Sequence, residues 1–205
     1  MAGSTPAQIT VGVLALQGAV REHVDVLRRL GTEARPVRTP ADLASVDALV
    51  IPGGESTVID KLSRAFGLDE PIRAAISGGL PVLGTCAGLI MLGDRIQGRA
   101  PGQRTFGGLD ATVRRNAFGS QGESFETDVA VPELGGPSMH AVFIRAPIVE
   151  DVGSAVTVLG RLNDGRIVAV QQGRLLGVAF HPEISGEHRF HARLIALARE
   201  AAGRG

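Results

Sequence analysis

The only cysteine of the chain, Cys86, stands between two glycines in the stretch VLGTCAG, residues 82–88. Apolar residues lead into this stretch and out of it, which predicts a strand, a very tight turn and a helix with the cysteine at the apex. The pattern Gly-x-Cys-x-Gly has the form of the Gly-x-Ser-x-Gly nucleophile elbow. There the helix N-terminus favours a thiolate, and the N–H of Ala87 can face a developing oxyanion. From the pentapeptide alone, a buried structural cysteine is an equal alternative.

A cysteine nucleophile needs a base and a group that orients the base, both usually distant in sequence. Among the five histidines, His181 is the best placed, because an apolar strand ends on it and Glu183 follows two residues later. Pro182 restricts the backbone before it, so ring and carboxylate are expected to keep a fixed relation. Cys86, His181 and Glu183 would then act as nucleophile, base and orienting group.

The remaining histidines are expected to take no part. His23 lies in an amphipathic helical pattern, and His188 and His191 lie on the polar C-terminal helix, which favours solvated surface for all three. His140 lies in a turn rich in glycine and proline, with no carboxylate beside it.

Two further glycine-marked turns follow apolar strands: Gln17-Gly18 and Gly53-Gly54-Glu55-Ser56. In open α/β sheets ligands lie beyond the carboxyl ends of the strands. We therefore expect both turns to lie near Cys86. For Glu55 and Ser56, a place at a helix N-terminus is an alternative explanation.

The chain between these motifs alternates strand and helix over its first ninety-odd residues, which predicts βαβ units and a parallel sheet. Strands are expected at 9–18, 33–38, 47–54 and 81–84, with helices at 19–31, 57–66, 70–77 and after Cys86. Beyond 106 the pattern changes to short β-type segments: 109–118, 124–131, 141–147, 155–162, 166–173 and 175–182. The Asp-Gly pair in 163–166 predicts a tight hairpin turn, and 187–201 a closing helix.

This pattern predicts one α/β domain over 9–201. Its fold is a three-layer open sheet, mostly parallel in the N-terminal half, with antiparallel C-terminal strands and helices on both faces. Residues 1–8 are interpreted as a disordered tail, because they lack the basic start and apolar core of a signal peptide.

Composition excludes several functional classes. The formal net charge is zero and the basic residues form no block, so we expect no nucleic-acid partner. No apolar run approaches the ~20 residues that span a bilayer, so we expect no membrane anchor. A single cysteine excludes an intramolecular disulfide and fits a reducing cytoplasm. The sequence offers no P-loop, and we expect neither a cofactor nor a metal.

Six stretches together resemble the class I (triad) glutamine amidotransferases, and among them the glutaminase subunits of pyridoxal 5′-phosphate synthases. These stretches are LALQGAVREH, PGGEST, GTCAG, RNAFG, FIRAP and FHPE. The resemblance runs from about residue 9 to 200. GTCAG with HPE is specific to the amidotransferase superfamily, whereas LQGAVREH and PGGEST separate this subgroup from others. The region 94–105 carries no recognisable motif and is interpreted as a variable loop.

The resemblance implies that Cys86 attacks the side-chain amide of L-glutamine, while His181, oriented by Glu183, moves the protons. It implies an oxyanion hole of the N–H groups of Ala87 and of the Gly53–Gly54 turn, whose peptide could flip between two states. The positions that match the family's glutamine-contacting residues are Gly53, Gly54, Glu55, Arg115, Ile144 and Arg145. Without the resemblance, Arg115 and Arg145 are equally well explained as solvated surface residues.

The resemblance also implies a partner. The ammonia would pass to a synthase subunit in a hetero-oligomeric complex, which builds pyridoxal 5′-phosphate from a pentose phosphate and a triose phosphate. We expect Gln17 and Gly18 to contact that subunit, with a part in activation. Two alternatives stay open: a free-standing γ-glutamyl hydrolase of the same fold, and a non-catalytic regulatory module. PGGEST and LQGAVREH count against the first, and the complete set of Cys86, His181 and Glu183 counts against the second.

Overall fold

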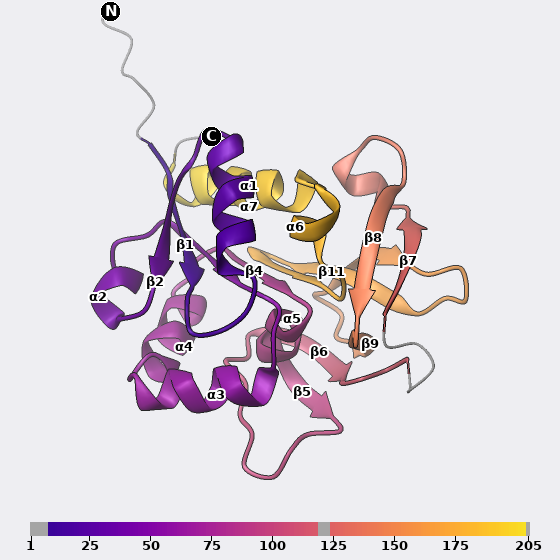
Figure 1. Ribbon diagram of the computed structural model, residues 1–205, viewed down its shortest axis with the longest axis horizontal. Helices are drawn as coiled ribbons and strands as arrows, with labels where there is room; N and C mark the ends of the chain where they lie inside the picture. Colours follow the sequence, from indigo (N-terminus) through magenta and orange to yellow (C-terminus); the bar gives the residue numbers. More distant parts are fainter. Residues whose placement is uncertain (1–7, 119–123, 204–205) are drawn as a thin grey trace, which may run out of the picture.

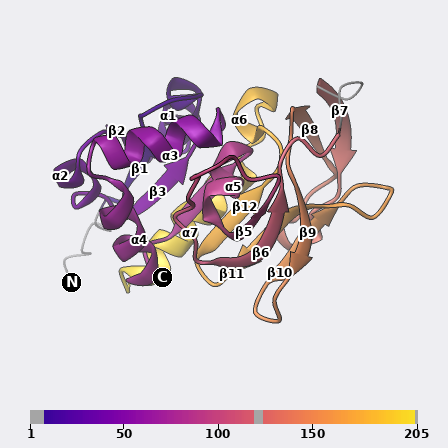
Figure 2. The same cartoon turned by 90° about the horizontal axis from the view of Figure 1, so that it is seen from below.

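The computed structural model describes residues 8–118 and 124–203. The strands within these ranges are β1 (Thr10–Leu14), β2 (Glu33–Val37), β3 (Ala48–Ile51), β4 (Val82–Thr85), β5 (Gly93–Gln97), β6 (Leu109–Arg114), β7 (Ser124–Val129), β8 (Met139–Ile144), β9 (Ile148–Val152), β10 (Thr157–Arg161), β11 (Ile167–Gln172) and β12 (Leu175–Val178). Ten of these described strands form one sheet in the order β2-β1-β3-β4-β12-β11-β9-β6-β5, with β10 paired to β11 (Figure 1). The other two, β7 and β8, form an antiparallel pair at one end of the molecule, and β2 lies at the opposite end (Figure 2).

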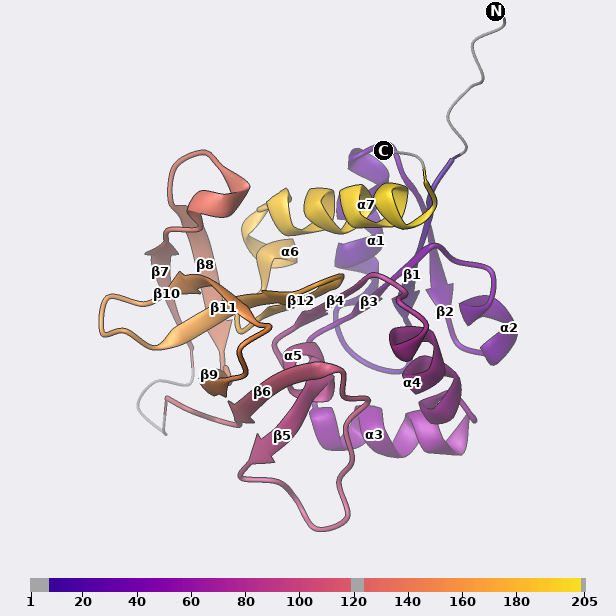
Figure 3. The same cartoon turned by 180° about the vertical axis from the view of Figure 1, so that it is seen from behind.

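Helices cover both faces of the large sheet. In the described residues they are α1 (Val20–Arg29), α2 (Pro40–Leu43), α3 (Ser56–Ala65), α4 (Asp69–Ser77), α5 (Ala87–Leu92), α6 (Pro182–Ser185) and α7 (Arg189–Ala201), with a short 3-10 helix at Pro132–Leu134. Helices α1 and α7 lie on one face, and α3, α4 and α5 lie on the other (Figures 1 and 3). The expected three-layer α/β fold is therefore confirmed.

The N-terminal half of the sheet is parallel, as predicted. Strand β1 pairs in parallel with β2 and β3, β3 with β4, and β4 with β12. All residues of β3 and β4 are buried, because helices cover both faces of the sheet. Apart from Gly84 and the terminal Thr85 these residues are apolar, as expected for buried parallel strands. Pro36 lies in β2 at the edge of the sheet, where its missing N–H costs no ladder hydrogen bond.

The C-terminal half is largely antiparallel. Strand β11 pairs antiparallel with β12, β10 and β9, and β9 with β6, whereas β5 and β6 are parallel. The Asp-Gly turn at 163–166 joins β10 to β11, as predicted. The sequence patterns did not predict α2, β5 or β9. Apart from Ile96, the residues of β5 after Gly93 are polar and exposed, so its alternation is weak. Strand β9 directly follows β8 and carries two acidic residues.

Element boundaries agree with the predicted segments to within a few residues elsewhere in the described part of the chain. The closing helix begins at Arg189 and ends at Ala201. Within the described residues, no helix is both long and apolar enough to cross a bilayer. The predicted tail 1–8 lies outside the described residues except for residue 8.

Candidate active site

The turns singled out in the sequence meet at one edge of the sheet. In-register parallel pairing brings the carboxyl ends of β3, β4 and β12 together: Ile51 pairs with Gly84, and Thr85 with Val178. The segments that follow these strands carry Gly53 and Cys86, and a few residues further on His181. Topology alone thus gathers residues far apart in sequence, at the edge of the sheet where open α/β folds bind their ligands.

Cys86 sits at a strained turn between β4 and α5. Its backbone has φ 49° and ψ −105°, in the left-handed half of conformational space that L residues avoid. The turn is possible because Gly88 has no side chain: a Cβ there would come within 2.0 Å of the Ile51 carbonyl oxygen. The Cys86 N–H is anchored on the Val178 carbonyl at 2.8 Å. The thiol is thereby held at the helix N-terminus, as the elbow pattern predicts.

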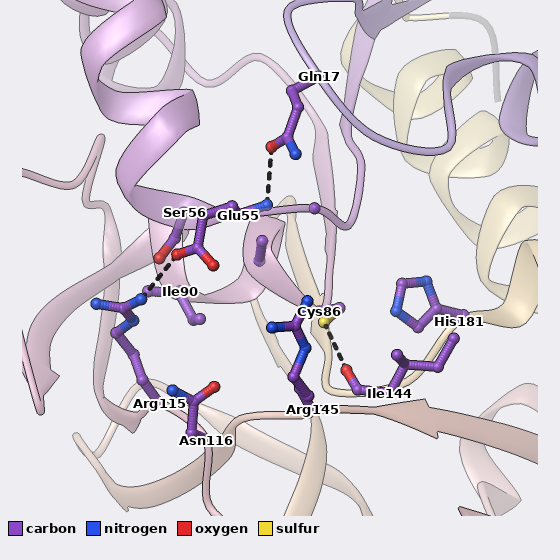
Figure 4. Close-up of a pocket in the computed structure, with 12 residues that line it drawn as sticks. Gln17, Glu55, Ser56, Cys86, Ile90, Arg115, Asn116, Ile144, Arg145 and His181 are labelled. Carbon is purple, nitrogen blue, oxygen red and sulfur yellow. Dashed lines mark hydrogen bonds and ion pairs between the residues drawn. The ribbon is translucent and has the colours of Figure 1, made fainter. Parts of the chain in front are cut away.

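The structure brings Cys86, His181 and Glu183 together. The His181 ring faces the sulfur (Figure 4), and its Nδ1 lies 2.8 Å from Glu183 Oε1. The backbone N–H of His181 donates to the Val142 carbonyl of β8 at 2.9 Å, which fixes the turn after β12. Both His181 and Glu183 are buried. The three groups are arranged in the order that nucleophile, base and orienting carboxylate require.

The protonation of His181 reflects these two neighbours. Burial alone would lower the pKa of His181, but hydrogen bonding and charge from Cys86 and Glu183 outweigh it and raise the pKa to about 10. The ring is therefore an imidazolium at neutral pH before substrate binds. Glu183 accepts the Nδ1–H, which leaves Nε2 as the nitrogen available to sulfur and substrate.

The Gly53–Gly54 turn presses against the triad and against the loop at Gln17. A Cβ on Gly53 would come within 2.4 Å of His181 Cε1, and one on Gly18 within 1.7 Å of the Gly53 carbonyl oxygen. That oxygen therefore faces the Gln17–Gly18 loop. In a planar trans peptide the N–H of Gly54 then points the opposite way, away from this loop. Gln17 fixes the next residue, because its Oε1 accepts the Glu55 N–H at 2.8 Å.

A cavity of about 210 Å³ opens beside Cys86 (Figure 4). This is below the roughly 300–1,000 Å³ of drug-sized ligand sites, and suits a ligand of amino-acid size. In the described residues, the non-glycine residues with positive φ are Cys86, Asn116 and Arg145, and all three line this cavity. Strained backbone conformations persist only where the surrounding structure holds them in place, and they cluster at functional sites.

Polar groups line the cavity on the side opposite His181. Arg115 donates to Glu55 Oε1 at 2.8 Å and to Gln103 Oε1 at 3.1 Å, and Gln103 donates to Ser56 Oγ at 2.9 Å. Arg145 also lines the cavity, and makes no ion pair with another described residue. The thiol of Cys86 lies 3.8 Å from the Ile144 carbonyl oxygen. All the predicted glutamine-contacting residues thus lie at the cavity or, for Gly53, directly behind it.

Four expectations are corrected by the structure. His23 and His191 are fully buried instead of solvated, because α1 and α7 pack against the same face of the sheet and bring the two rings together. His140 lies in β8 and its Nε2 is 2.7 Å from Glu126 Oε2 on β7, a carboxylate that strand pairing supplies. The region 94–105 is not merely a variable loop, because it contains most of β5 and the buried Gln103.

In the part of the chain that the structure describes, no side-chain cluster suggests a metal site. Among residues 8–118 and 124–203, no three His, Cys, Asp or Glu side chains are grouped to hold an ion.

Comparison with known proteins is consistent with this site. The sequence model of the SNO glutamine amidotransferase family matches residues 13–199. A protein from Clavibacter sepedonicus named "Pyridoxal 5'-phosphate synthase subunit PdxT" is 62% identical over 205 residues, covering 98% of each chain. One of the same name from Leifsonia xyli subsp. xyli is 65% identical over 191 residues, covering 93% of this chain and 94% of the relative.

Solved structures show the same fold. A crystal structure of a glutamine amidotransferase superposes with a TM-score of 0.85 at 48% identity, and the match covers 92% of this chain and 98% of that one. A glutamine amidotransferase from Thermotoga maritima superposes with a TM-score of 0.61 at 17% identity, covering 95% of this chain and 86% of that one, which is a likeness of fold alone.

Proposed function

Because the chain belongs to the SNO glutamine amidotransferase family, we propose that it is the glutaminase subunit of a pyridoxal 5′-phosphate synthase. It hydrolyses L-glutamine to L-glutamate and ammonia at Cys86. The names of the relatives at 62% and 65% identity support the pathway. The observation that carries the chemistry is the strained Cys86 facing an imidazole whose Nδ1 is bound to a buried carboxylate.

The cavity recognises both ends of the amino acid. Arg145 is free to bind the α-carboxylate, since a guanidinium holds a carboxylate bidentately. Glu55 is held by Arg115, and its second oxygen is available for the α-ammonium group. With this end fixed, the side-chain amide of glutamine reaches Cys86, and the Ile144 carbonyl lies beside the sulfur to accept the amide N–H.

The first half of the reaction forms a thioester. The Cys86 thiolate attacks the amide carbon, and the carbonyl oxygen becomes an oxyanion. His181 donates its Nε2 proton to the amide nitrogen, the C–N bond breaks and ammonia leaves. Two backbone N–H groups are suited to the oxyanion, those of Ala87 and Gly54. Neither donates to an acceptor in the described part of the chain, so both are available for the substrate.

The second half restores the enzyme. Neutral His181 takes a proton from a water molecule, and the resulting hydroxide attacks the thioester carbon. The C–S bond breaks, glutamate leaves and Cys86 returns as the thiolate beside the imidazolium. Glu183 keeps the Nδ1–H in place throughout, so that Nε2 alone exchanges the proton.

The released ammonia is passed to a synthase subunit, and Gln17 and Gly18 lie on the rim that this subunit contacts. Free ammonia would be lost by diffusion, so the site is expected to work within the complex. We also propose a cytoplasmic location, because the catalytic thiol must stay reduced.

The proposal is tested with diazo-oxo-norleucine, a glutamine-like alkylating agent, on the chain mixed with its synthase subunit. Glutaminase activity should disappear in proportion to alkylation at Cys86 measured by mass spectrometry. Cys86→Ser should fold normally, judged by circular dichroism, and hydrolyse no glutamine. Complete inactivation with Cys86 unlabelled would overturn the assignment, and so would an active Cys86→Ser enzyme.

A further inference from the structure

Behind the triad lies a second pair of buried side chains that the mechanism above does not use. His23 of α1 and His191 of α7 are both fully buried. His23 Nδ1 is 2.8 Å from His191 Nε2. On its other side, His23 Nε2 is 3.5 Å from Glu183 Oε2 and 3.3 Å from Thr85 Oγ1. The rings therefore continue the line from Cys86 through His181 and Glu183.

Glu183 needs a partner on this side. Its side chain is fully buried, and Oε1 is bound to His181. Its Oε2 has no hydrogen bond within normal distance in the described residues. A buried carboxylate oxygen without a donor is costly. His23 Nε2, at 3.5 Å, is the nitrogen that a small side-chain rotation would bring into contact.

We infer that His23 is a positioning residue for the glutaminase triad: it donates its Nε2–H to Glu183 Oε2, while His191 fixes its tautomer. Held on both oxygens, Glu183 cannot rotate, and Oε1 stays aligned with His181 Nδ1. The expected effect on glutamine turnover rests on the proposed function. The assignment of protons to the ring nitrogens does not, because it follows from the positions of the buried side chains.

Electrostatics selects one tautomer for each ring. If His191 donates Nε2–H to His23 Nδ1, then His23 carries its proton on Nε2 and presents a donor to Glu183. The opposite arrangement would place a lone pair against the carboxylate and leave the buried Nδ1–H of His191 without an acceptor, since that atom has no partner in the described residues. In proteins a buried N–H without an acceptor is rarer than a buried acceptor without a donor.

Both rings are also neutral, as this arrangement requires. Burial, then the charges of His191 and His181, lower the pKa of His23 well below its usual value. Burial, then the charge of His188 against the opposing effect of Glu187, lowers the pKa of His191 to about 4. Each ring therefore has one donor and one acceptor at neutral pH.

Three substitutions at His23 separate positioning from packing. Glutamine places an amide nitrogen four bonds from Cα, as far as Nε2, whereas asparagine places one at the Nδ1 position and leucine offers none. In the complex with the synthase subunit, His23→Leu and His23→Asn should lower kcat for glutamine about 10–100-fold with KM unchanged. His23→Gln should stay within a few-fold of the original enzyme. Leu27→Ala, also buried on α1, is the control for a loosened helix and should keep its kcat.

Nitrogen-15 NMR of histidine in the full chain gives a readout that does not depend on activity. At neutral pH the His23 and His191 rings should both be neutral with the proton on Nε2. A proton on His23 Nδ1, equal kcat in the Leu and Gln variants, or a matching kcat loss in Leu27→Ala would each overturn the inference. Failure of the proposed function would look different: no glutamine turnover by the original enzyme, with the tautomers unchanged.

Discussion

We expect His181 and Glu183 to have unequal roles, although both belong to the proposed triad. In the proposed mechanism His181 exchanges protons with the substrate, whereas Glu183 does not contact the substrate and instead holds the Nδ1–H of His181. In a measured protease triad, loss of the base costs about a million-fold in kcat and loss of the carboxylate about ten-thousand-fold. The difference arises because a ring without its carboxylate still transfers protons, from a poorer orientation.

We therefore predict that His181→Ala lowers kcat about as much as Cys86→Ala, and Glu183→Gln less. Removing the carboxylate charge should also lower the pKa of His181 from about 10, so that the ring loses its proton at a lower pH. Turnover measurements and an NMR titration of His181 check both. If Glu183→Gln left pKa and turnover unchanged while Glu55→Gln abolished turnover, the triad would have to be redrawn.

At the scale of elements, the site depends on how closely the turn after β3 approaches the turn after β12. A methyl group on Gly53 would come within 2.4 Å of His181 Cε1, so Gly53→Ala must displace the ring or the turn. A misplacement of about 1 Å costs on the order of a hundredfold in rate. We expect that loss in kcat with little change in melting temperature. Gly78→Ala, whose methyl would keep 3.2 Å from its nearest neighbour, is the control. Equal kcat in both variants would contradict the tight fit.

We expect the loop between β5 and β6 to support substrate binding through Gln103. Its amide bridges Arg115 and Ser56 from a buried position, and Arg115 in turn holds Glu55. Gln103→Leu should raise the KM for glutamine about tenfold, since a hydrogen bond to a charged group contributes about 1.5–3 kcal/mol, and should change kcat little. Gln97→Leu, on the exposed side of β5, should alter neither constant. A lowered kcat with KM intact would instead assign Gln103 to the reaction steps.

The packing of α1 against α7 makes stability dependent on pH. His191 is neutral in the folded protein down to about pH 4, whereas in the unfolded chain it gains a proton below its usual value of about 6.5. Between these values the unfolded state binds more protons, so the free energy of unfolding falls as pH falls, by up to about 1.4 kcal/mol per pH unit for each such histidine. His23, whose pKa is also lowered, adds to this. Urea unfolding at several pH values gives the free energy of unfolding as a function of pH, and its slope should be shallower in His191→Leu than in the original protein. An unchanged slope would contradict the lowered pKa of His191.

For the whole molecule, features set by neighbouring residues in the sequence could be predicted far better than contacts between elements distant in the sequence. The strand–turn–helix at Cys86, the βαβ half and the hairpin at 163–166 each follow from residues adjacent in sequence. The triad could be assembled because strand ends in a parallel sheet meet at one edge. The buried pair of His23 and His191 could not be foreseen. The two residues are 168 positions apart, and a polar residue on an amphipathic helix is usually solvated.

The polar contacts of the buried Gln103 and of the exposed His140 depend on distant elements, and they were missed for the same reason. Gln103 is polar within a polar loop, and only the fold shows that it reaches Ser56 on α3, 47 residues away. His140 acquires its carboxylate through the β7–β8 pairing. Sequence periodicity reports which face of an element is apolar, and not which polar residue another element will cover.

The loop at Gln17 and Gly18 lies against the Gly53–Gly54 turn of the proposed oxyanion hole, and we predict that the enzyme is activated there when the synthase subunit docks. Gln17 holds the Glu55 N–H, and Gly18 abuts the Gly53 carbonyl, so movement of the loop moves the Gly54 N–H. One oxyanion donor is worth roughly 3–4 kcal/mol, about 10²–10³-fold in kcat.

Glutamine turnover should rise by about that factor when saturating synthase subunit is added to the isolated chain. Gln17→Ala should lose most of this response. Gln171→Ala, whose side chain reaches only the Gly173 carbonyl on the surface, should keep it. Equal turnover of free and docked enzyme would refute the switch, and a full response in Gln17→Ala would remove Gln17 from it.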